Sequence, residues 1–410
     1  MSILVSHSSK NINVSINLTT SKSESNRVLI IQSILNNCFE INNLSNADDT
    51  KTLVELLKSK RTVLDVGHAG TTMRFLTAFF ASQQREVTIT GSERMQQRPI
   101  KILVEALNQL GSNISYLKKD GFPPIKINKS EKLIGGEIGL DGSVSSQYIS
   151  ALLLVAPTFK NGLTINFKGK VVSKPYIMMT INIMRYFGAD VTWQGNKIIV
   201  KNTAYQPINF IVEADWSAAS YWYSIAALSE NACIEIIGLK ENSLQGDSYV
   251  VELYKFFGVE TTFTKKGIRI TKTTKIDKES IPEVNFENFP DLAQTFAVTA
   301  AALNFSVKLT GLSTLRIKET DRISALQKEL ISCGFNITIE NDDLIILPSN
   351  GASQTANKII NTYNDHRMAM AFAPLSMIFP ITINDEKVVE KSYPNFWKDL
   401  TKSDFHVIPF

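Results

Sequence analysis

The stretch LQKELISCGFNITIENDDLII, residues 326–346, contains the pattern that decides the fold of this 410-residue chain. Its apolar residues first follow a helical period, and Gly334 stands where the helix would end. Two short apolar runs separated by a turn then predict a β-hairpin. The same order of helix, glycine and hairpin recurs around Gly111, Gly188 and Gly258. These glycines are 77, 70 and 76 residues apart, which indicates an internal repeat.

The repeat predicts the fold class and the number of domains. The chain length leaves room for about six such units, of which the outer two are expected to be atypical. Alternating helices and strands predict an α/β fold, while a hairpin after each helix argues against a pure βαβ sheet. With 410 residues and 44% hydrophobic composition, the chain is expected to form two large globular domains.

Composition and short motifs exclude several functional classes. The net charge is only +4 and no block of Lys and Arg occurs, so no nucleic-acid or membrane partner is expected. Three distant cysteines without CxxC spacing and a start without a signal-peptide pattern predict a cytosolic protein without a disulfide framework. No Walker A or GxGxxG motif and no paired histidines occur, so neither a cofactor nor a metal is expected. No GxSxG nucleophile motif is present either, and neither His68 nor His366 has a recognisable serine partner in the sequence.

Four predicted helices begin with small or hydroxyl residues beside a basic or amide side chain. Because helix starts expose N–H groups and partial positive charge, such starts suit anions. One start alone is most simply ordinary capping, but four together predict a site for more than one anionic group. The starts are 21–27, 69–74, 143–147 and 364–367.

Two further basic segments have both a simple and a functional interpretation. Arg94 and Arg98 are expected on a solvated face or, because Pro99 disfavours helix at Arg98, on an extended segment that presents this guanidinium. Segment 318–322 reads KETDR and precedes a helix, so it is either a surface helix start with ion pairs or a carboxylate, Glu319, held between cations for proton transfer.

Read together, these residues resemble the 5-enolpyruvylshikimate-3-phosphate synthase family over nearly the whole chain. Eleven segments carry the resemblance in sequence order, and we consider chance an implausible explanation for all of them. They are 21–27, 69–74, 94–99, 141–147, 173–176, 215–221, 242–247, 290–291, 318–322, 363–370 and 391–394.

The resemblance implies a two-domain α/β fold in which each domain has three βαβαββ units and helix N-termini face the interdomain cleft. It implies an N-terminal domain over residues 21–213, mainly for shikimate 3-phosphate. A C-terminal domain over residues 1–20 and 214–410 is implied mainly for phosphoenolpyruvate and the catalytic carboxylates. A monomer without cofactor, acting on two small molecules in the cytoplasm, is expected.

The resemblance also implies the residues of the site. Shikimate 3-phosphate is expected to bind Lys22, Ser23, Arg27, Ser145, Ser146, Gln147, Ser173, Tyr176, Asp291 and Lys318. Phosphoenolpyruvate is expected to bind Lys22, Gly70, Arg98, Gln147, Glu319, Arg322, His366, Arg367 and Lys391. The expected catalytic residues are Lys22, Asp291 and Glu319.

The implied reaction transfers the enolpyruvyl group of phosphoenolpyruvate to the 5-hydroxyl of shikimate 3-phosphate, with loss of phosphate from a tetrahedral adduct. It belongs to the shikimate pathway, which leads to chorismate and the aromatic amino acids, and the family is the target of glyphosate. We expect Asp291 to take the hydroxyl proton and either Glu319 or Lys22 to protonate carbon, a choice that stays open here.

Three positions depart from the family pattern. Thr20 stands where glycine is usual, Thr314 where asparagine is common and Phe75 where proline often follows the arginine. The segment between Asp49 and Ala69 also looks about one hairpin short. Thr314 is expected to weaken one substrate contact, and Phe75 to alter packing under Gly70.

Two alternative functions fit the sequence less well. The sister enolpyruvyl transferase that acts on UDP-N-acetylglucosamine shares fold and chemistry, but its usual loop cysteine is missing from residues 91–99. An inactive anion-binding homologue is disfavoured because Lys22, Asp291 and Glu319 all occur.

Overall fold

A computed structural model describes residues 1–83, 85–129, 133–273, 283–349 and 358–410. The described chain forms two compact units: unit 1 comprises Met1–Thr20 with Glu213–Phe410, and unit 2 comprises Ser21–Val212. Glu213 belongs to unit 1 because its buried carboxylate accepts hydrogen bonds there from the Trp216 indole (2.8 Å) and the Lys240 amide (2.8 Å).

Unit 2 contains two complete repeats of the predicted kind. The first consists of β4 (Val63–Asp65), α3 (Gly70–Ser82), β5 (Val87–Thr90), α4 (Glu93–Gln96), α5 (Lys101–Gln109), β6 (Ile114–Tyr116) and β7 (Ile125–Ile127). The second consists of β8 (Gly136–Asp141), α6 (Ser146–Val155), η1 (Ala156–Thr158), β9 (Leu163–Lys168), α7 (Lys174–Tyr186), β10 (Val191–Gln194) and β11 (Lys197–Val200).

The third repeat of unit 2 is reduced. It consists of α1 (Lys22–Ile34), β3 (Ile41–Asn42), α2 (Asp48–Lys58) and β12 (Phe210–Ile211). Its sheet contains only the parallel pair β12 and β3 among the described residues. This repeat therefore has a parallel pair but no hairpin.

The described residues of unit 1 form three repeats. The first consists of β2 (Asn11–Asn17), α8 (Trp216–Leu228), β13 (Asn231–Ile237), η2 (Gly246–Tyr249), α9 (Val250–Lys255), β14 (Val259–Thr264) and β15 (Gly267–Lys272). The second consists of β16 (Glu283–Asn285), η3 (Pro290–Leu292), α10 (Ala293–Ala302), β17 (Val307–Thr310), η4 (Ser313–Ile317), α11 (Arg322–Ser332), β18 (Asn336–Glu340) and β19 (Asp343–Leu347). The third consists of β20 (Lys358–Ile360), α12 (His366–Phe372), η5 (Ala373–Met377), β21 (Ile381–Asn384), η6 (Glu386–Lys391), α13 (Phe396–Thr401), β22 (His406–Pro409) and, from the chain start, β1 (Ser2–Ser6).

Each four-stranded sheet has the same strand order, as β4-β5-β7-β6 illustrates. The first two strands of the repeat pair in parallel, and the hairpin adds two antiparallel strands. In the last sheet, β1 lies between β21 and β22, so the chain start completes the final repeat. The α/β class and the recurring unit predicted from the sequence are confirmed.

The glycines that revealed the repeat end helices as predicted. Gly111, Gly188, Gly258 and Gly334 have φ angles of +108°, +84°, +70° and +96°. This left-handed region carries a steric penalty for residues with a Cβ, so glycine is favoured where each helix turns into its hairpin.

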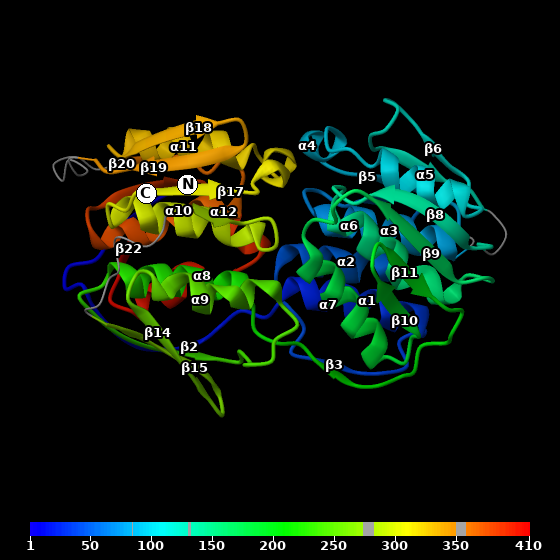
Figure 1. Ribbon diagram of the computed structural model, residues 1–410, viewed down its shortest axis with the longest axis horizontal. Coiled ribbons are helices and arrows are strands. Elements are labelled where there is room, and N and C mark those ends of the chain that lie inside the picture. Colours follow the sequence, from blue (N-terminus) through cyan, green and yellow to red (C-terminus); the bar gives the residue numbers. More distant parts are fainter. Residues whose placement is uncertain (84, 130–132, 274–282, 350–357) are drawn as a thin grey trace. The chain divides into compact units, whose positions relative to one another are not determined.

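Several helices of unit 1 are buried on most sides, among them α12, which begins at an expected anion-binding start. Along α8, α10 and α12, nearly every residue is buried, because these helices lie between the sheets of unit 1 (Figure 1). Helices that are apolar all round belong in a core. Their first turns are consequently fixed by packing along the whole helix.

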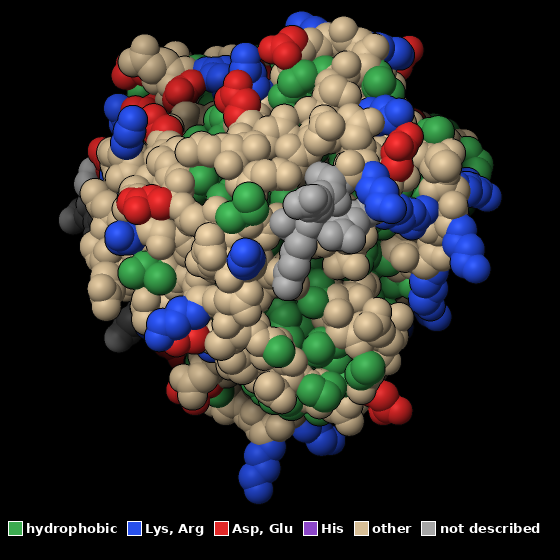
Figure 2. Space-filling view, turned by 90° about the vertical axis from the view of Figure 1, so that its right-hand side faces the viewer, with side chains coloured by type: hydrophobic (Ala, Val, Ile, Leu, Met, Phe, Trp, Pro, Cys, Tyr) green, Lys and Arg blue, Asp and Glu red, His purple; other side chains and the backbone are tan. Residues whose placement is uncertain are grey.

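The surface carries mixed charge. On the face drawn in Figure 2, Lys and Arg side chains stand at separate places, with Asp and Glu side chains among them. Within the described ranges, no helix combines the length and the apolar character needed to cross a membrane.

Candidate active site

Unit 1 gathers charged side chains where three helices begin. Arg322 opens α11, for which Asp321 is the N-cap residue, and Arg367 lies in the first turn of α12. Asp291 lies in η3, immediately before α10, and Lys391 ends η6. Two repeats of unit 1 thus supply one cluster, which we call the unit-1 ion cluster: Asp291, Lys318, Glu319, Arg322, Asp365, Arg367 and Lys391.

Arg322 lies at the centre of the unit-1 ion cluster and is 1% exposed. Its Nε and Nη2 atoms donate to the two carboxylate oxygens of Asp365, at 2.7 and 3.2 Å. Nη1 donates to Asp291 (3.0 Å) and Nη2 also to Glu319 (2.9 Å). Burial disfavours the charge, but the three carboxylates outweigh burial and raise the pKa of Arg322 above its usual value.

Asp291 and Glu319 are each shared between cations. Asp291 pairs with Arg367 (3.0 Å) and lies 3.9 Å from the Lys318 ammonium, while Glu319 accepts from Lys391 at 2.7 Å. Burial opposes ionisation of Asp291, but the Arg367, Lys318 and Arg322 charges hold its pKa well below the usual range. Asp291 is therefore a carboxylate, able to accept a proton, at neutral pH.

Buried groups surround Arg367 and His366. Arg367 donates to the backbone oxygen of Asp291 (3.1 Å) and approaches the Tyr221 hydroxyl (3.4 Å). Burial raises the pKa of Tyr221 to about 12, so this hydroxyl stays protonated. His366, 1% exposed, has its Nδ1 atom 3.7 Å from Asp365.

In unit 2, Lys22 lies in the first turn of α1 and its ammonium pairs with Asp49 of α2 at 3.0 Å. The α2 backbone at Asp49 also accepts from the Thr72 hydroxyl of α3, at 3.1 Å. These contacts join the starts of α1 and α3 through α2. Lys22 consequently has a carboxylate neighbour that the sequence did not predict.

Arg27 is buried one turn into α1 and donates mainly to neutral oxygens. Its Nε donates to the Thr180 hydroxyl (2.7 Å), and its Nη2 donates to both the Ser150 hydroxyl (3.2 Å) and the Tyr176 carbonyl (3.2 Å). Burial lowers the pKa of Arg27 to about 10, which still leaves the group cationic at neutral pH. The Phe75 ring lies 5.6 Å below the guanidinium, so the phenylalanine that departs from the family pattern provides a cation–π contact.

Gly70, Arg98 and Gln147 lie together. A methyl group built on Gly70 would lie 2.5 Å from Nη1 of Arg98, so only glycine leaves this guanidinium in place. Arg98 is 7% exposed, and its Nε has no hydrogen-bond partner among the residues that the structure describes. The Gln147 amide donates to Thr71, next to Gly70, at 3.2 Å.

The remaining expected residues of unit 2 form the starts of α6 and α7. Ser145 caps α6, because its hydroxyl accepts from the backbone amide of Gln147 (3.4 Å), and Ser146 is the first residue of the helix. Ser173 precedes α7 with a left-handed backbone (φ +53°), and the Tyr176 amide donates to its carbonyl (3.1 Å).

The sequence missed the partners of these groups. The sequence gives no sign that Asp49 pairs with Lys22 or that Asp365 pairs with Arg322, because these contacts span 27 and 43 residues. A serine partner of His68 was not expected either, yet the Ser92 hydroxyl lies 2.9 Å from its Nδ1 atom. Among the departures, Thr20 pairs with Ala214 in an isolated bridge, and the Thr314 hydroxyl has no hydrogen-bond partner within the described part of the chain.

Known proteins resemble the chain over this whole arrangement. Residues 57–400 match the family model described as EPSP synthase (3-phosphoshikimate 1-carboxyvinyltransferase). The chain belongs to the EPSP synthase family. It is accordingly a transferase of the shikimate pathway that moves the enolpyruvyl group of phosphoenolpyruvate to shikimate 3-phosphate. This membership favours that reaction over the two alternatives weighed from the sequence.

Individual members of the EPSP synthase family cover almost the full chain. A 3-phosphoshikimate 1-carboxyvinyltransferase of Bacteroides fragilis (strain YCH46) is 48% identical over 97% of this chain and 96% of its own. One of Methanospirillum hungatei is 35% identical over 93% of this chain and 94% of its own. The solved EPSP synthase of Acinetobacter baumannii, at 22% identity, superposes with a TM-score of 0.78 over 100% of both chains, which supports the fold.

Proposed function

We propose that this chain performs enolpyruvyl transfer with the unit-1 ion cluster and the helix starts of unit 2. The observation that supports this most is the ion cluster itself, in which the buried Arg322 is surrounded by three carboxylates. Such a cluster offers acid, base and anion-binding groups within hydrogen-bond distance of one another.

Shikimate 3-phosphate, in this proposal, takes hydrogen bonds mainly from unit 2. The helix starts of α6 and α7 offer hydroxyls and the partial positive charge of a helix N-terminus, which suit a phosphate and a carboxylate. Lys22 and Arg27 add two cations on α1. The proposed residues of unit 2 are Lys22, Ser23, Arg27, Ser145, Ser146, Gln147, Ser173 and Tyr176, and those of unit 1 are Asp291 and Lys318.

Phosphoenolpyruvate, in this proposal, takes its charged contacts from arginine and lysine side chains of both units. Guanidinium groups bind carboxylate and phosphate with paired hydrogen bonds, which orient the substrate as well as neutralise it. The proposed residues are Lys22, Gly70, Arg98 and Gln147 in unit 2 and Glu319, Arg322, His366, Arg367 and Lys391 in unit 1.

The reaction needs one group that accepts a proton and one group that delivers a proton. Asp291 takes the proton of the attacking 5-hydroxyl, and Glu319 or Lys22 delivers a proton to the methylene carbon of phosphoenolpyruvate. A carbon–oxygen bond forms to the adjacent carbon and gives a tetrahedral adduct. Phosphate then leaves, and the group that delivered the proton takes one methyl proton back, which restores the double bond in the product. The arginines stabilise the charge that stays on the carboxylate and phosphate.

Phosphate release on mixing the two substrates tests this proposal. We expect inorganic phosphate only when shikimate 3-phosphate and phosphoenolpyruvate are both present, with equal amounts of the enolpyruvyl ether detected by mass spectrometry. Release with UDP-N-acetylglucosamine instead would favour the sister reaction. No release with either acceptor would support an inactive homologue.

A monomer in the cytoplasm is part of the same proposal. The three cysteines, which are free thiols in the structure, suit a reducing compartment. Light scattering should give a mass near 45.7 kDa. A mass near twice that value would contradict the monomer.

A further inference from the structure

The segment that leads into α12 has an unfavourable backbone. Tyr363 and Asn364 are consecutive left-handed residues, with φ angles of +54° and +56°. Asparagine tolerates this region, but for a bulky side chain such as tyrosine it is unusual and must be held by surrounding contacts. The next residues, Asp365, His366 and Arg367, belong to or adjoin the unit-1 ion cluster.

Glu329 provides such contacts from α11. Its Oε1 atom accepts hydrogen bonds from the Tyr363 hydroxyl (2.5 Å) and from the Asn361 side-chain amide (3.4 Å), and its Oε2 atom accepts from the Asn361 backbone amide (3.1 Å). The side chain belongs to a residue only 1% exposed, so these hydrogen bonds satisfy a carboxylate that is shielded from water.

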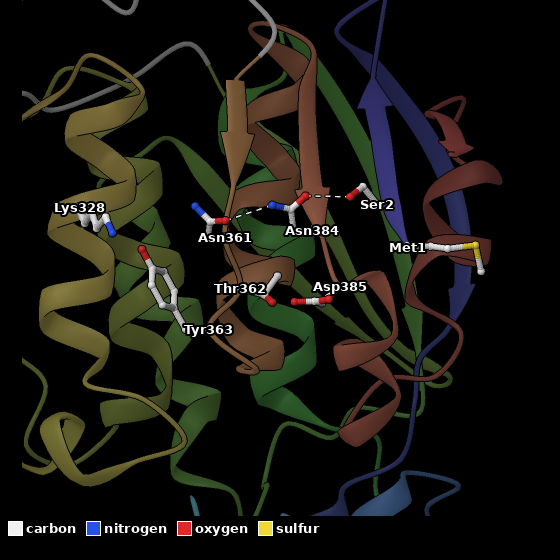
Figure 3. A pocket seen from close by; sticks show the side chains of 8 residues that line it. All are labelled: Met1, Ser2, Lys328, Asn361, Thr362, Tyr363, Asn384 and Asp385. Carbon is white, nitrogen blue, oxygen red and sulfur yellow. Dashed lines mark hydrogen bonds between the residues drawn. The ribbon is translucent and has the colours of Figure 1, made fainter.

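A cavity adjoins this segment. In Figure 3, Tyr363 directs its hydroxyl toward the helix that carries Lys328, whose ammonium lies 5.8 Å from the tyrosine ring centroid. The cavity has a volume of about 550 Å³ and is lined by Met1, Ser2, Lys328, Asn361, Thr362, Tyr363, Asn384 and Asp385. On the cavity side, the Asn361 side chain accepts a hydrogen bond from the Asn384 side chain (3.0 Å), while the contacts with Glu329 restrain the segment from the α11 side.

One helix therefore holds both ends of the segment. Arg322 and Glu329 are seven residues apart on α11, which is close to two full turns, so they lie on the same side of the helix. The Arg322 guanidinium donates to the Asp365 carboxylate at the start of α12. The Glu329 carboxylate accepts from Asn361 and Tyr363, which precede α12.

We propose that Glu329 is a positioning residue for enolpyruvyl transfer: by holding Asn361 and Tyr363 from α11, it fixes the left-handed segment that places Arg367 in the unit-1 ion cluster. This inference rests on the proposed roles of Arg322 and Arg367. Glu329 touches no substrate in this account and acts only through the start of α12.

Two substitutions test the inference without removing bulk. Glu329→Gln keeps the length of the side chain but replaces one acceptor oxygen by a donor, and Tyr363→Phe removes only the hydroxyl. Because small displacements of a binding group cost up to about 100-fold in rate, we expect each variant to lower kcat/KM for phosphoenolpyruvate by about 10- to 100-fold. The KM for shikimate 3-phosphate should change far less, since most of its proposed residues lie in unit 2.

The double variant distinguishes positioning from general destabilisation. If both residues act through one contact, Glu329→Gln with Tyr363→Phe should be no worse than the more damaged single variant. The matched control is Tyr223→Phe, which also removes a buried hydroxyl in unit 1, one that pairs with Thr261 at 2.7 Å. This control should keep the wild-type kcat/KM.

Assays are run well below the melting temperature of each variant, so that loss of folded protein does not enter the rates. Wild-type kcat/KM in both folded single variants would overturn the inference while leaving the proposed function intact. If Glu329→Gln fails to fold, Tyr363→Phe alone decides, because it retains the Glu329 contacts with Asn361. A wild-type chain without activity would instead refute the proposed function.

Discussion

At the scale of single residues, Asp291 and Glu319 make different contacts within the same ion cluster. Asp291 is held as a carboxylate by three cations, whereas Glu319 accepts from Arg322 and Lys391. Asp291→Asn and Glu319→Gln keep the shape of each side chain and remove its proton transfer. We expect kcat to fall by about 10²- to 10⁴-fold in each variant, with much smaller changes in substrate binding.

Steady-state kinetics and equilibrium binding of shikimate 3-phosphate measure these two effects separately. The matched control is Asp399→Asn on α13, where a buried carboxylate accepts from the Tyr393 hydroxyl (2.8 Å) outside the ion cluster. It should lower stability but leave kcat unchanged. Near-normal turnover in Asp291→Asn would remove Asp291 from the mechanism, and the same result for Glu319→Gln would leave carbon protonation to Lys22.

The second prediction concerns Gly70 and the inhibition of the enzyme by glyphosate. The wild-type enzyme should be inhibited competitively with phosphoenolpyruvate, because Arg98, Arg322 and Lys391 offer cations to the inhibitor's charged groups. In Gly70→Ala the new methyl group would lie 2.5 Å from the Arg98 guanidinium, so that Arg98 must move. A misplaced contact of this size discriminates between ligands by about 10- to 200-fold, and the larger inhibitor should lose more affinity than the substrate.

Inhibition measured at several phosphoenolpyruvate concentrations checks this prediction. The inhibition constant for glyphosate should rise more than the KM for phosphoenolpyruvate, while the KM for shikimate 3-phosphate stays constant. Equal losses for inhibitor and substrate would show that Gly70 does not discriminate between them. Wild-type activity that is unaffected by glyphosate would contradict the expected pocket.

The sequence indicates the candidate site residues better than it indicates the side chains that these residues contact. Helix starts can be read locally, since Ser21, Ser145 and Asp365 each cap the helix that follows. The carboxylates that neutralise Lys22 and Arg322 come from other helices, and no local period encodes such contacts. The sequence also gives no sign of the hydrogen bonds of Glu329, because they join α11 to another segment of the chain. Within α11, the position of Glu329 in the sequence resembles that of an ordinary surface glutamate.

At the scale of elements, the repeats could be read from the glycines because a helix that turns into a hairpin needs a left-handed residue. The reduced sheet of β3 and β12 could not be identified in this way, since it has no glycine-linked hairpin. The chain start also gives no sign that β1 completes the last sheet, because strand pairing across 376 to 382 residues leaves no local pattern.

Substitution of Gly111 tests whether a helix that turns into a hairpin needs glycine at this position. Its φ angle is +108°, and the nearest atom to a methyl group built there is 3.6 Å away, so the added methyl would meet no steric clash. Gly111→Ala should therefore destabilise unit 2 through its backbone alone, by about 1–2 kcal/mol. Urea unfolding followed by circular dichroism measures the change, and kcat should stay at the wild-type value.

The control for Gly111→Ala is Gly139→Ala in β8. Gly139 lacks a left-handed backbone, and the nearest atom to its added methyl is 3.9 Å away. The free energy of unfolding of the Gly139→Ala variant should stay within about 0.5 kcal/mol of the wild-type value. Equal stability of the Gly111→Ala variant and the wild type would show that helix α5 does not depend on this glycine.

At the scale of the whole molecule, the proposed residues divide unequally between the two units. Most of those assigned to shikimate 3-phosphate occur in unit 2, whereas phosphoenolpyruvate draws on residues of both. The first amides of a helix have no intrahelical acceptor, so they exchange hydrogen readily until a ligand oxygen accepts from them. Hydrogen exchange can therefore follow each substrate along the chain.

Shikimate 3-phosphate alone should slow exchange at the starts of α6 and α7, within residues 145–149 and 173–177. Adding a non-reacting phosphoenolpyruvate analogue should extend protection to the starts of α11 and α12 in unit 1, because the analogue's anionic groups bind Arg322 and Arg367. The hairpin of β14 and β15, which contributes no proposed residue, should exchange at the same rate in all samples. Protection of α11 and α12 by shikimate 3-phosphate alone, with none at α6, would reverse the assignment of the two substrates. Arg367 would then bind shikimate 3-phosphate, and Ser145 would bind phosphoenolpyruvate.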